Sequence, residues 1–307
     1  MRSIYEETKY ILKKYGITAN KSLGQNFLIN DEVVKKIVES AEISKDDLII
    51  EIGPGLGTLT KELLEKAGKV IAIELDKRML EILTDRFSLY NNFELINEDV
   101  LKVDLNNIIK QNLSQDIQNQ TLNLEPQTSS LKLTTLNIKH AKIVANLPYY
   151  ITTPIVMKLL EEKLPIDSIT IMIQKEVADR LIEKPGGKNT GAITYAIYYY
   201  ATAEEIYKVM PNSFIPEPSV ESKVIKLNIR HNNPVKVEDE KLMFKIIKYA
   251  FMQRRKTLVN SLENSKLFKS KKDIENMLEK LCIDTKIRGE ALSLEDYSNI
   301  TNFVTKM

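Results

Sequence analysis

The sequence predicts an α/β fold followed by a smaller, all-helical C-terminal domain. Between residues 31 and 176, short apolar runs alternate with amphipathic segments of about ten residues. That alternation is typical of βαβ units, which build a parallel sheet. From about residue 235 onward the apolar spacing is helical. We therefore predict an α/β domain over 1–234 and a helical domain over 235–307.

Strands are predicted where a short apolar run meets a turn or a glycine. DLIIEIG (47–53) is an apolar run that ends in glycines, and KVIAIELD (69–76) is a second such run. Runs of this length, bounded by turn residues, are typical of buried strands in a parallel sheet. The predicted strands are 47–53, 69–76, 93–99, 141–150 and 168–176.

Helices are predicted from amphipathic spacing between and after these strands. In LTKELLEKAG the apolar residues recur every three or four positions, and Gly68 ends the helix. The last predicted helix has Ser293 as its N-cap. The predicted helices are 32–43, 59–68, 77–88 and 151–163 in the α/β domain, and 239–265, 271–283 and 293–307 in the helical domain.

One long segment fits neither pattern. Residues 111–140 are rich in Asn, Gln, Ser and Thr and have little apolar periodicity. Such composition is typical of a polar loop that does not build a core. We predict a flexible surface insertion between the third and fourth strands.

Bulk properties exclude several classes of protein. The 307 residues are 43% hydrophobic and 28% charged, and no apolar run approaches the ~20 residues that span a bilayer. The N-terminus has no apolar signal stretch. A single cysteine, Cys282, excludes an intramolecular disulfide and a cysteine-based zinc cluster, and His140 and His231 are isolated in the sequence. We expect a cytosolic protein without a metal site.

Charge is distributed unevenly along the chain. The net charge is +3 over residues 1–30, −7 over 31–240 and +6 over 241–307. Basic ends suggest a polyanionic partner held by the ends of the chain. A Lys-rich solvated surface explains the same numbers, and charge alone does not decide between the two.

A glycine-rich loop follows the first predicted strand. In EIGPGLGTLT the glycines Gly53, Gly55 and Gly57 allow a sharp turn at the carboxyl edge of a Rossmann-like sheet. Glu74 ends the second strand, where a carboxylate can accept from ribose hydroxyls. Asp99 ends the third strand, where a carboxylate can accept from an exocyclic amine.

Two cofactors compete for this loop. The spacing usual for NAD requires a glycine where the chain has Thr58, and Pro54 removes an amide that a pyrophosphate would use. S-adenosylmethionine (SAM) has no pyrophosphate and needs only ribose, adenine and amino-acid contacts. The sequence therefore favours SAM over NAD. A third interpretation is that the three glycines serve only the geometry of the turn and bind no cofactor.

The fourth predicted strand ends on the unusual turn Asn-Leu-Pro-Tyr. Asn146 would face the methyl group of SAM, and its amide oxygen and a backbone carbonyl held by Pro148 can accept the two hydrogens of an amine. That would direct the nitrogen lone pair toward the methyl group. Tyr149 offers a face on which a base can stack, worth ~1–3 kcal/mol. A turn Asn beside a core Tyr is the simpler reading of this tetrapeptide taken alone.

Eight segments carry a family resemblance. They are KSLGQNFLIN (21–30), IIEIGPGLGTLT (49–60), VIAIELD (70–76), NEDVL (97–101), VANLPYYITTPI (144–155), MIQKEVADRL (172–181), FIPEPSVESKVIKL (214–227) and FMQRRKTLVNSL (251–262). In this order they resemble the ribosomal RNA adenine N6-dimethyltransferase family, in particular its KsgA/RsmA type. The resemblance implies a SAM-dependent methyltransferase that dimethylates two adjacent adenines in a 3′-end hairpin loop of 16S rRNA. It also implies the small (30S) ribosomal subunit as partner, no membrane, and a monomer.

The resemblance also assigns roles to single residues. It implies that SAM is bound by Asn26, Leu28, Gly53, Gly55, Glu74, Asp99 and Asn146. It implies that the target adenine meets Asn146, Leu147, Pro148, Tyr149 and Phe214, with Tyr149 and Phe214 as stacking faces. The basic cluster Arg254, Arg255 and Lys256 would lie on a helix and contact rRNA phosphates. Because consecutive helical residues spread around the axis, some of the three can pair internally instead.

Two alternatives stay open. One is the related family that methylates an adenine of large-subunit rRNA and confers antibiotic resistance; NLPYY, FIPEPSVESK and the long helical tail favour the small-subunit type. The other is a mainly non-catalytic checkpoint in small-subunit assembly. The chain also departs from the family pattern, because 111–140 is longer than usual and the segment GKNTGAITYAIYYY lacks the usual Tyr-Gly pair.

Overall fold

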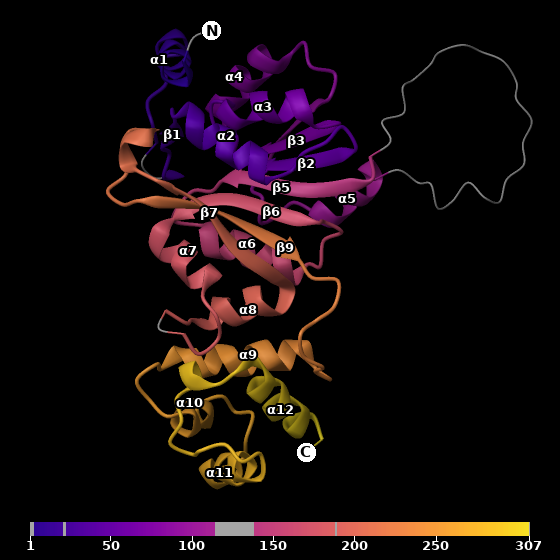
Figure 1. Ribbon diagram of the computed structural model, residues 1–307, viewed down its shortest axis with the longest axis vertical. Helices are drawn as coiled ribbons and strands as arrows, with labels where there is room; N and C mark the ends of the chain where they lie inside the picture. The colour runs from indigo at the N-terminus through magenta and orange to yellow at the C-terminus, as the bar shows by residue number, and fades with distance from the viewer. Residues whose placement is uncertain (1–2, 21–22, 114–137, 188, 307) are drawn as a thin grey trace, which may run out of the picture. The chain divides into compact units, whose positions relative to one another are not determined.

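A mixed α/β architecture is built around one large sheet. The computed structural model describes residues 3–20, 23–113, 138–187 and 189–306. Within them, seven strands follow the order β4-β3-β2-β5-β6-β9-β7 (Figure 1). The strands are β2 (Asp47–Ile52), β3 (Lys69–Glu74), β4 (Phe93–Asn97), β5 (His140–Asn146), β6 (Ser168–Gln174), β7 (Ala201–Val209) and β9 (Ser222–Ile229).

The pairing of these strands confirms the predicted α/β class. β2 pairs in parallel with β3 and with β5, β3 with β4, and β5 with β6. Every residue of β2 is buried, which explains why its sequence is an apolar run rather than an alternating pattern. Some predicted strands are too long at their carboxyl ends. β3 stops at Glu74 because Asp76 caps the next helix, and β5 stops at Asn146, two residues before Pro148.

Helices connect the parallel strands. The side chains of Asn30, Asp76 and Asp104 cap three of them by accepting from backbone amides of the first turn. In Figure 1, α3 and α4 lie above β2 and β3, and α6 lies below β5 and β6. The helices are α1 (Ile4–Lys14), α2 (Asp31–Ser40), α3 (Thr58–Lys66), α4 (Lys77–Phe87), α5 (Leu105–Asn112) and α6 (Thr152–Glu161). The predicted insertion 111–140 lies mostly outside the described residues.

A second, two-stranded ladder joins distant parts of the chain. β1 (Phe27–Leu28) pairs with β8 (Phe214–Ile215) in antiparallel fashion, with Leu28 opposite Phe214. The amide of Ile29 extends the contact by donating to the carbonyl oxygen of Ser213 at 2.9 Å. This ladder fixes the N-terminal segment beside a segment almost two hundred residues later.

Contacts divide the chain into two units, which are residues 1–175 with 205–226, and 176–204 with 227–307. The predicted boundary at residue 235 falls inside the second unit, because the tyrosines of α8 pack against α9. The rings of Tyr200 and Phe244 stack at 5.5 Å between centroids, and the Tyr200 hydroxyl donates to Glu240 at 2.6 Å. The helices here are α7 (Lys175–Ile182), α8 (Ala192–Tyr200), α9 (Glu240–Met252), α10 (Leu258–Glu263), α11 (Lys271–Lys280) and α12 (Leu294–Thr305).

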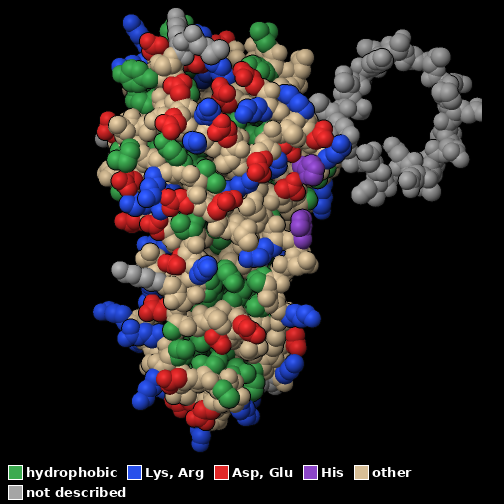
Figure 2. Space-filling view, viewed as in Figure 1, with side chains coloured by type: hydrophobic (Ala, Val, Ile, Leu, Met, Phe, Trp, Pro, Cys, Tyr) green, Lys and Arg blue, Asp and Glu red, His purple; other side chains and the backbone are tan. Residues whose placement is uncertain are grey.

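The single helix predicted over 239–265 is wrong. α9 ends at Met252, and Thr257 caps α10 by accepting from the amide of Asn260. Arg254, Arg255 and Lys256 therefore lie in the turn between two helices, not on a helix. The predicted cap at Ser293 is confirmed, since its hydroxyl accepts from the amide of Asp296. Figure 2 shows Lys and Arg side chains projecting where Figure 1 draws α9 to α12.

None of the helices in the described parts of the chain is both long and apolar enough to cross a bilayer.

A buried carboxyl in β2 makes stability depend on pH. Burial raises the pKa of Glu51 from 4.5 to about 8, although the Thr60 hydroxyl donates to it at 2.6 Å. Between these two values the folded state keeps a proton that the unfolded state has lost. The free energy of unfolding should therefore fall as pH rises from about 5 to about 8.

We expect Glu51→Gln to remove that part of the pH dependence, because an amide still accepts from Thr60 and does not titrate. Calorimetric melting temperatures between pH 5 and 9 measure the effect, with the exposed Glu65→Gln as control. Parallel curves for wild type and Glu51→Gln would contradict the assignment.

Candidate active site

The site lies where the strand order reverses. The chain moves from β2 outward to β3 and β4, then returns to place β5 on the other side of β2. Ligands of open α/β sheets bind at such a switch point, outside the carboxyl ends of the strands. Ile52 pairs with Ala145, so the next residues, Gly53 and Asn146, come side by side. The glycine loop and the Asn-Leu-Pro-Tyr turn therefore share one edge.

The backbone conformation of the glycine loop requires glycine at three positions. Gly53, Gly55 and Gly57 have φ values of 66°, 56° and 81°, in the left-handed region that side chains disfavour. At Gly57 a Cβ atom would also lie 2.5 Å from the ring of Phe87. The loop can thus turn sharply into α3 and keep its backbone close to the edge of the sheet.

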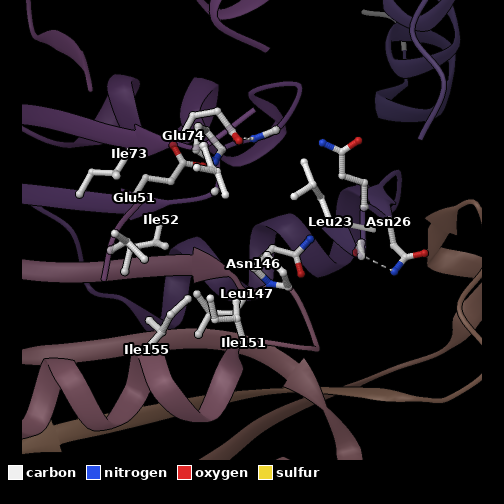
Figure 3. Close-up of a pocket in the computed structure, with 18 of the residues that line it drawn as sticks. Leu23, Asn26, Glu51, Ile52, Ile73, Glu74, Asn146, Leu147, Ile151 and Ile155 are labelled. Atoms are coloured by element: carbon white, nitrogen blue, oxygen red, sulfur yellow. Dashed lines mark hydrogen bonds between the residues drawn. The ribbon is translucent and has the colours of Figure 1, made fainter. Parts of the chain in front are cut away.

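A cavity of about 1080 Å³, part of it open to solvent, occupies this edge. In Figure 3 the Asn146 amide lies between the pair Glu51 and Glu74 and the loop that carries Asn26. The cavity brings together all the residues predicted to meet cofactor or target base: Asn26, Leu28, Gly53, Gly55, Glu74, Asp99, Asn146, Leu147, Pro148, Tyr149 and Phe214.

The cavity is acidic. Four carboxyl groups line it, and no Lys, Arg or His occurs among the described residues of its wall. The two oxygens of Glu74 accept from the amides of Gly55 at 3.1 Å and Asp76 at 2.8 Å, and burial raises the pKa of this carboxyl. The four carboxyl groups are those of Glu51, Glu74, Glu98 and Asp99. Carboxylates on such a wall attract a cationic ligand and repel a phosphate, although Glu51, with its raised pKa, keeps its proton up to about pH 8.

The turn after β5 presents two acceptors. The Asn146 side chain makes no hydrogen bond with the described residues, although it lines the cavity. The carbonyl oxygen of Leu147 likewise accepts none from them, while its amide donates to Met172 at 3.1 Å. The Pro148 carbonyl is occupied, because Ile151 and Thr152 donate to it. The turn therefore holds an amide and a carbonyl ready for a ligand with two N–H groups.

The N-terminal segment closes another side of the cavity. Asn26 donates to the carbonyl of Gly24 at 3.2 Å, which keeps this loop tight. Gln25, which sequence analysis did not single out, donates to Asp76 at 2.8 Å and so ties the loop to the end of β3. The pKa of Asp76 is lowered, mainly by the hydrogen bond from Arg78 and further by Gln25. Nothing in the sequence pattern signals this long-range contact.

Among the described residues, four aromatic residues line the cavity, and Tyr149 and Phe214, which are predicted to stack on the base, are two of them. The other two are Phe27 and Tyr150. The Tyr149 hydroxyl lies 2.6 Å from the hydroxyl of Ser222, and burial raises the pKa of the phenol. Phe214 is 1% exposed and paired in the ladder with Leu28. The structure brings both rings to the cavity, and their stacking on a base remains a prediction.

The predicted RNA-binding cluster lies in the other unit. Arg254 donates to the Thr190 carbonyl at 3.0 Å and pairs with Glu290 at 3.2 Å. Arg255 and Lys256 are exposed and form no ion pair with the described residues. The three basic residues thus have different surroundings, and two of them are available to an external anion.

The described residues contain no group of three or more His, Cys, Asp or Glu side chains arranged to hold a metal ion.

Comparisons with known proteins agree on one family. The family model for ribosomal RNA adenine dimethylase matches residues 16–306. The chain is 47% identical to ribosomal RNA small subunit methyltransferase A of Alkaliphilus metalliredigens over 97% of this chain and 96% of that one. It is 44% identical to the protein of the same name from Geobacillus thermodenitrificans, over 96% and 94%.

Solved structures are similar as well. A dimethyladenosine transferase from Plasmodium falciparum superposes with a TM-score of 0.70 at 25% identity, covering 91% of this chain and 98% of that one. The 23S rRNA methyltransferase ErmE shares the fold, with a TM-score of 0.62 at 22% identity, covering 91% and 100%. From the family model, the full-length relatives and the fold, the chain belongs to the ribosomal RNA adenine dimethylase family.

Proposed function

We propose that this enzyme uses SAM to dimethylate the N6 amines of two adjacent adenines in a 3′-end hairpin loop of 16S rRNA. The substrate is the small ribosomal subunit during its assembly, which makes the enzyme cytoplasmic. Curated relatives at 44–47% identity, all named small-subunit methyltransferases, support this over the large-subunit alternative. The 23S enzyme ErmE is only 22% identical.

The acidic cavity wall is the observation that carries the cofactor assignment. SAM has a sulfonium and an ammonium group and no phosphate, whereas NAD has a pyrophosphate. A wall with four carboxyl groups and no described basic side chain fits the first ligand and disfavours the second. Glu74 would accept from ribose hydroxyls and Asp99 from the adenine amine, with Asn26, Leu28, Gly53 and Gly55 completing the cofactor site.

The turn after β5 orients the target amine. When bound, SAM supplies an electrophilic methyl group. The Asn146 amide oxygen and the Leu147 carbonyl accept the two N–H groups of the adenine amine, because neither acceptor is engaged by the described residues. Both acceptors also stabilise the positive charge that develops on the nitrogen during transfer, and the nitrogen then loses a proton to solvent water. Tyr149 and Phe214 hold the flipped base by its faces.

Removing one acceptor tests this function. We expect Asn146→Ala to slow methyl transfer to undermethylated small subunits by ~100-fold or more, the range seen when one such transition-state contact is lost. Binding of SAM and of the subunit should change only a few-fold. Labelled methyl transfer and co-sedimentation measure the two effects, with the exposed Asn107→Ala on α5 as matched control.

The outcomes separate catalysis from a checkpoint role. Loss of methylation with retained binding supports catalysis and leaves a checkpoint role compatible with it. Methylation by Asn146→Ala at the wild-type rate would show that the acceptor is misassigned.

The basic turn between α9 and α10 contributes to RNA binding. Arg255 and Lys256 are exposed and without an ion pair among the described residues, whereas Arg254 is held by Glu290. Phosphate contacts release counterions, so their loss lowers both affinity and its salt dependence.

We expect the double variant Arg255→Ala/Lys256→Ala to weaken subunit binding at 0.1 M salt and to reduce the slope of log K against log salt by about one to two. Binding titrations at several salt concentrations measure this. Lys66→Ala/Lys110→Ala removes the same charge from exposed positions of α3 and α5 and serves as control. Equal slopes for wild type and the turn variant would show that this turn does not contact the RNA.

A further inference from the structure

The Tyr149 side chain lines the cavity, and a hydrogen bond at its hydroxyl group restricts its rotation. Its hydroxyl lies 2.6 Å from the Ser222 hydroxyl, a short distance for two neutral hydroxyl groups. Ser222 is 1% exposed, so water does not compete for this bond from the Ser222 side. The two parts of the Tyr149 side chain thus act differently. The ring lines the cavity, and the hydroxyl group holds the ring in place.

The backbone around Ser222 is held firmly. Ser222 is the first residue of β9. On one side, the Glu221 carbonyl accepts from the amide of Lys175 at 3.0 Å, and the Glu221 carboxylate pairs with Lys175 at 2.7 Å. On the other side, the ammonium group of Lys223 pairs with Glu205 at 2.5 Å. Ser222 can hold the Tyr149 ring only if its own backbone does not move. The contacts of Glu221 and Lys223 restrict that backbone.

The turn that carries Tyr149 is fixed at its other end. Leu147 donates its amide to Met172, and the Pro148 carbonyl accepts from Ile151 and Thr152. The backbone before and after Tyr149 is therefore set, and the remaining freedom is rotation of its side chain. The bond to Ser222 restricts that rotation.

We propose that Ser222 is a positioning residue for methyl transfer, which holds the Tyr149 ring at the orientation that receives the target base. This inference rests on the proposed function, in which Tyr149 stacks on the adenine. Ser222 acts through Tyr149 and does not line the cavity. Its removal should therefore affect the reaction of bound RNA more than the binding of SAM.

The test compares two ways of breaking the same bond. Ser222→Ala and Tyr149→Phe should each lower kcat for methyl transfer about five- to tenfold, as expected for one hydrogen bond, with KM and SAM affinity within about twofold. Because both remove one interaction, the double variant should lose no more than either single variant. Ser168→Ala is the matched control: Ser168 is also buried and also begins a strand of the sheet, but it has no contact with Tyr149.

A second readout does not depend on activity. In protein labelled with ¹³C at the tyrosine Cζ atom, the resonance of Tyr149 is the one missing from Tyr149→Phe. It should shift in Ser222→Ala and stay unchanged in Ser168→Ala. If Ser222→Ala does not fold, Tyr149→Phe still reports on the bond through kcat.

The outcomes are distinct. A normal kcat for Ser222→Ala overturns the positioning role, whether or not the resonance moves. Losses that add in the double variant overturn it too, because the two residues would then act separately. If the wild type methylates no RNA, the proposed function fails and the positioning role of Ser222 in methyl transfer fails with it, while the resonance still shows whether Ser222 holds the ring.

Discussion

The parallel pairing of β2 with β5 is the constraint on which the site depends. It sets Gly53 beside Asn146, so the glycine loop, proposed to bind the cofactor, and the Asn-Leu-Pro-Tyr turn, proposed to bind the target amine, open into the same cavity. A shift of the register by one residue would turn the side chains of β5 to the opposite face of the sheet. Such a shift would cost packing energy, because the side chains of β2 are buried on both faces of the sheet and pack beside those of β5.

We propose that charge gives this cavity its selectivity for a cationic cofactor. Four carboxyl groups line the cavity without a described basic neighbour, and burial raises the pKa of Glu51 and Glu74. A cationic ligand would favour the ionised form of these carboxyl groups, a source of binding energy that a neutral wall lacks. Under the proposed function, loss of the sulfonium charge on methyl transfer would weaken the attraction between this wall and the product.

Sequence patterns predicted much of the fold, and the family resemblance predicted the cavity. Apolar runs predicted β2, β3 and β6 because both faces of these strands are buried. The two-residue ladder of Phe27–Leu28 with Phe214–Ile215 has no periodicity to detect, and the bonds Gln25–Asp76 and Tyr149–Ser222 join residues far apart in the chain. The break after α9 was missed because apolar spacing continues across it, although Thr257 is a normal capping residue.

The most direct test of the central claim is labelled methyl transfer from SAM to undermethylated small subunits, with mature large subunits and naked rRNA in parallel. Mass spectrometry of the digested RNA then counts methyl groups on each adenine. We expect N6,N6-dimethyladenine from small subunits alone. Label in large-subunit rRNA, or no transfer to any RNA, would contradict it.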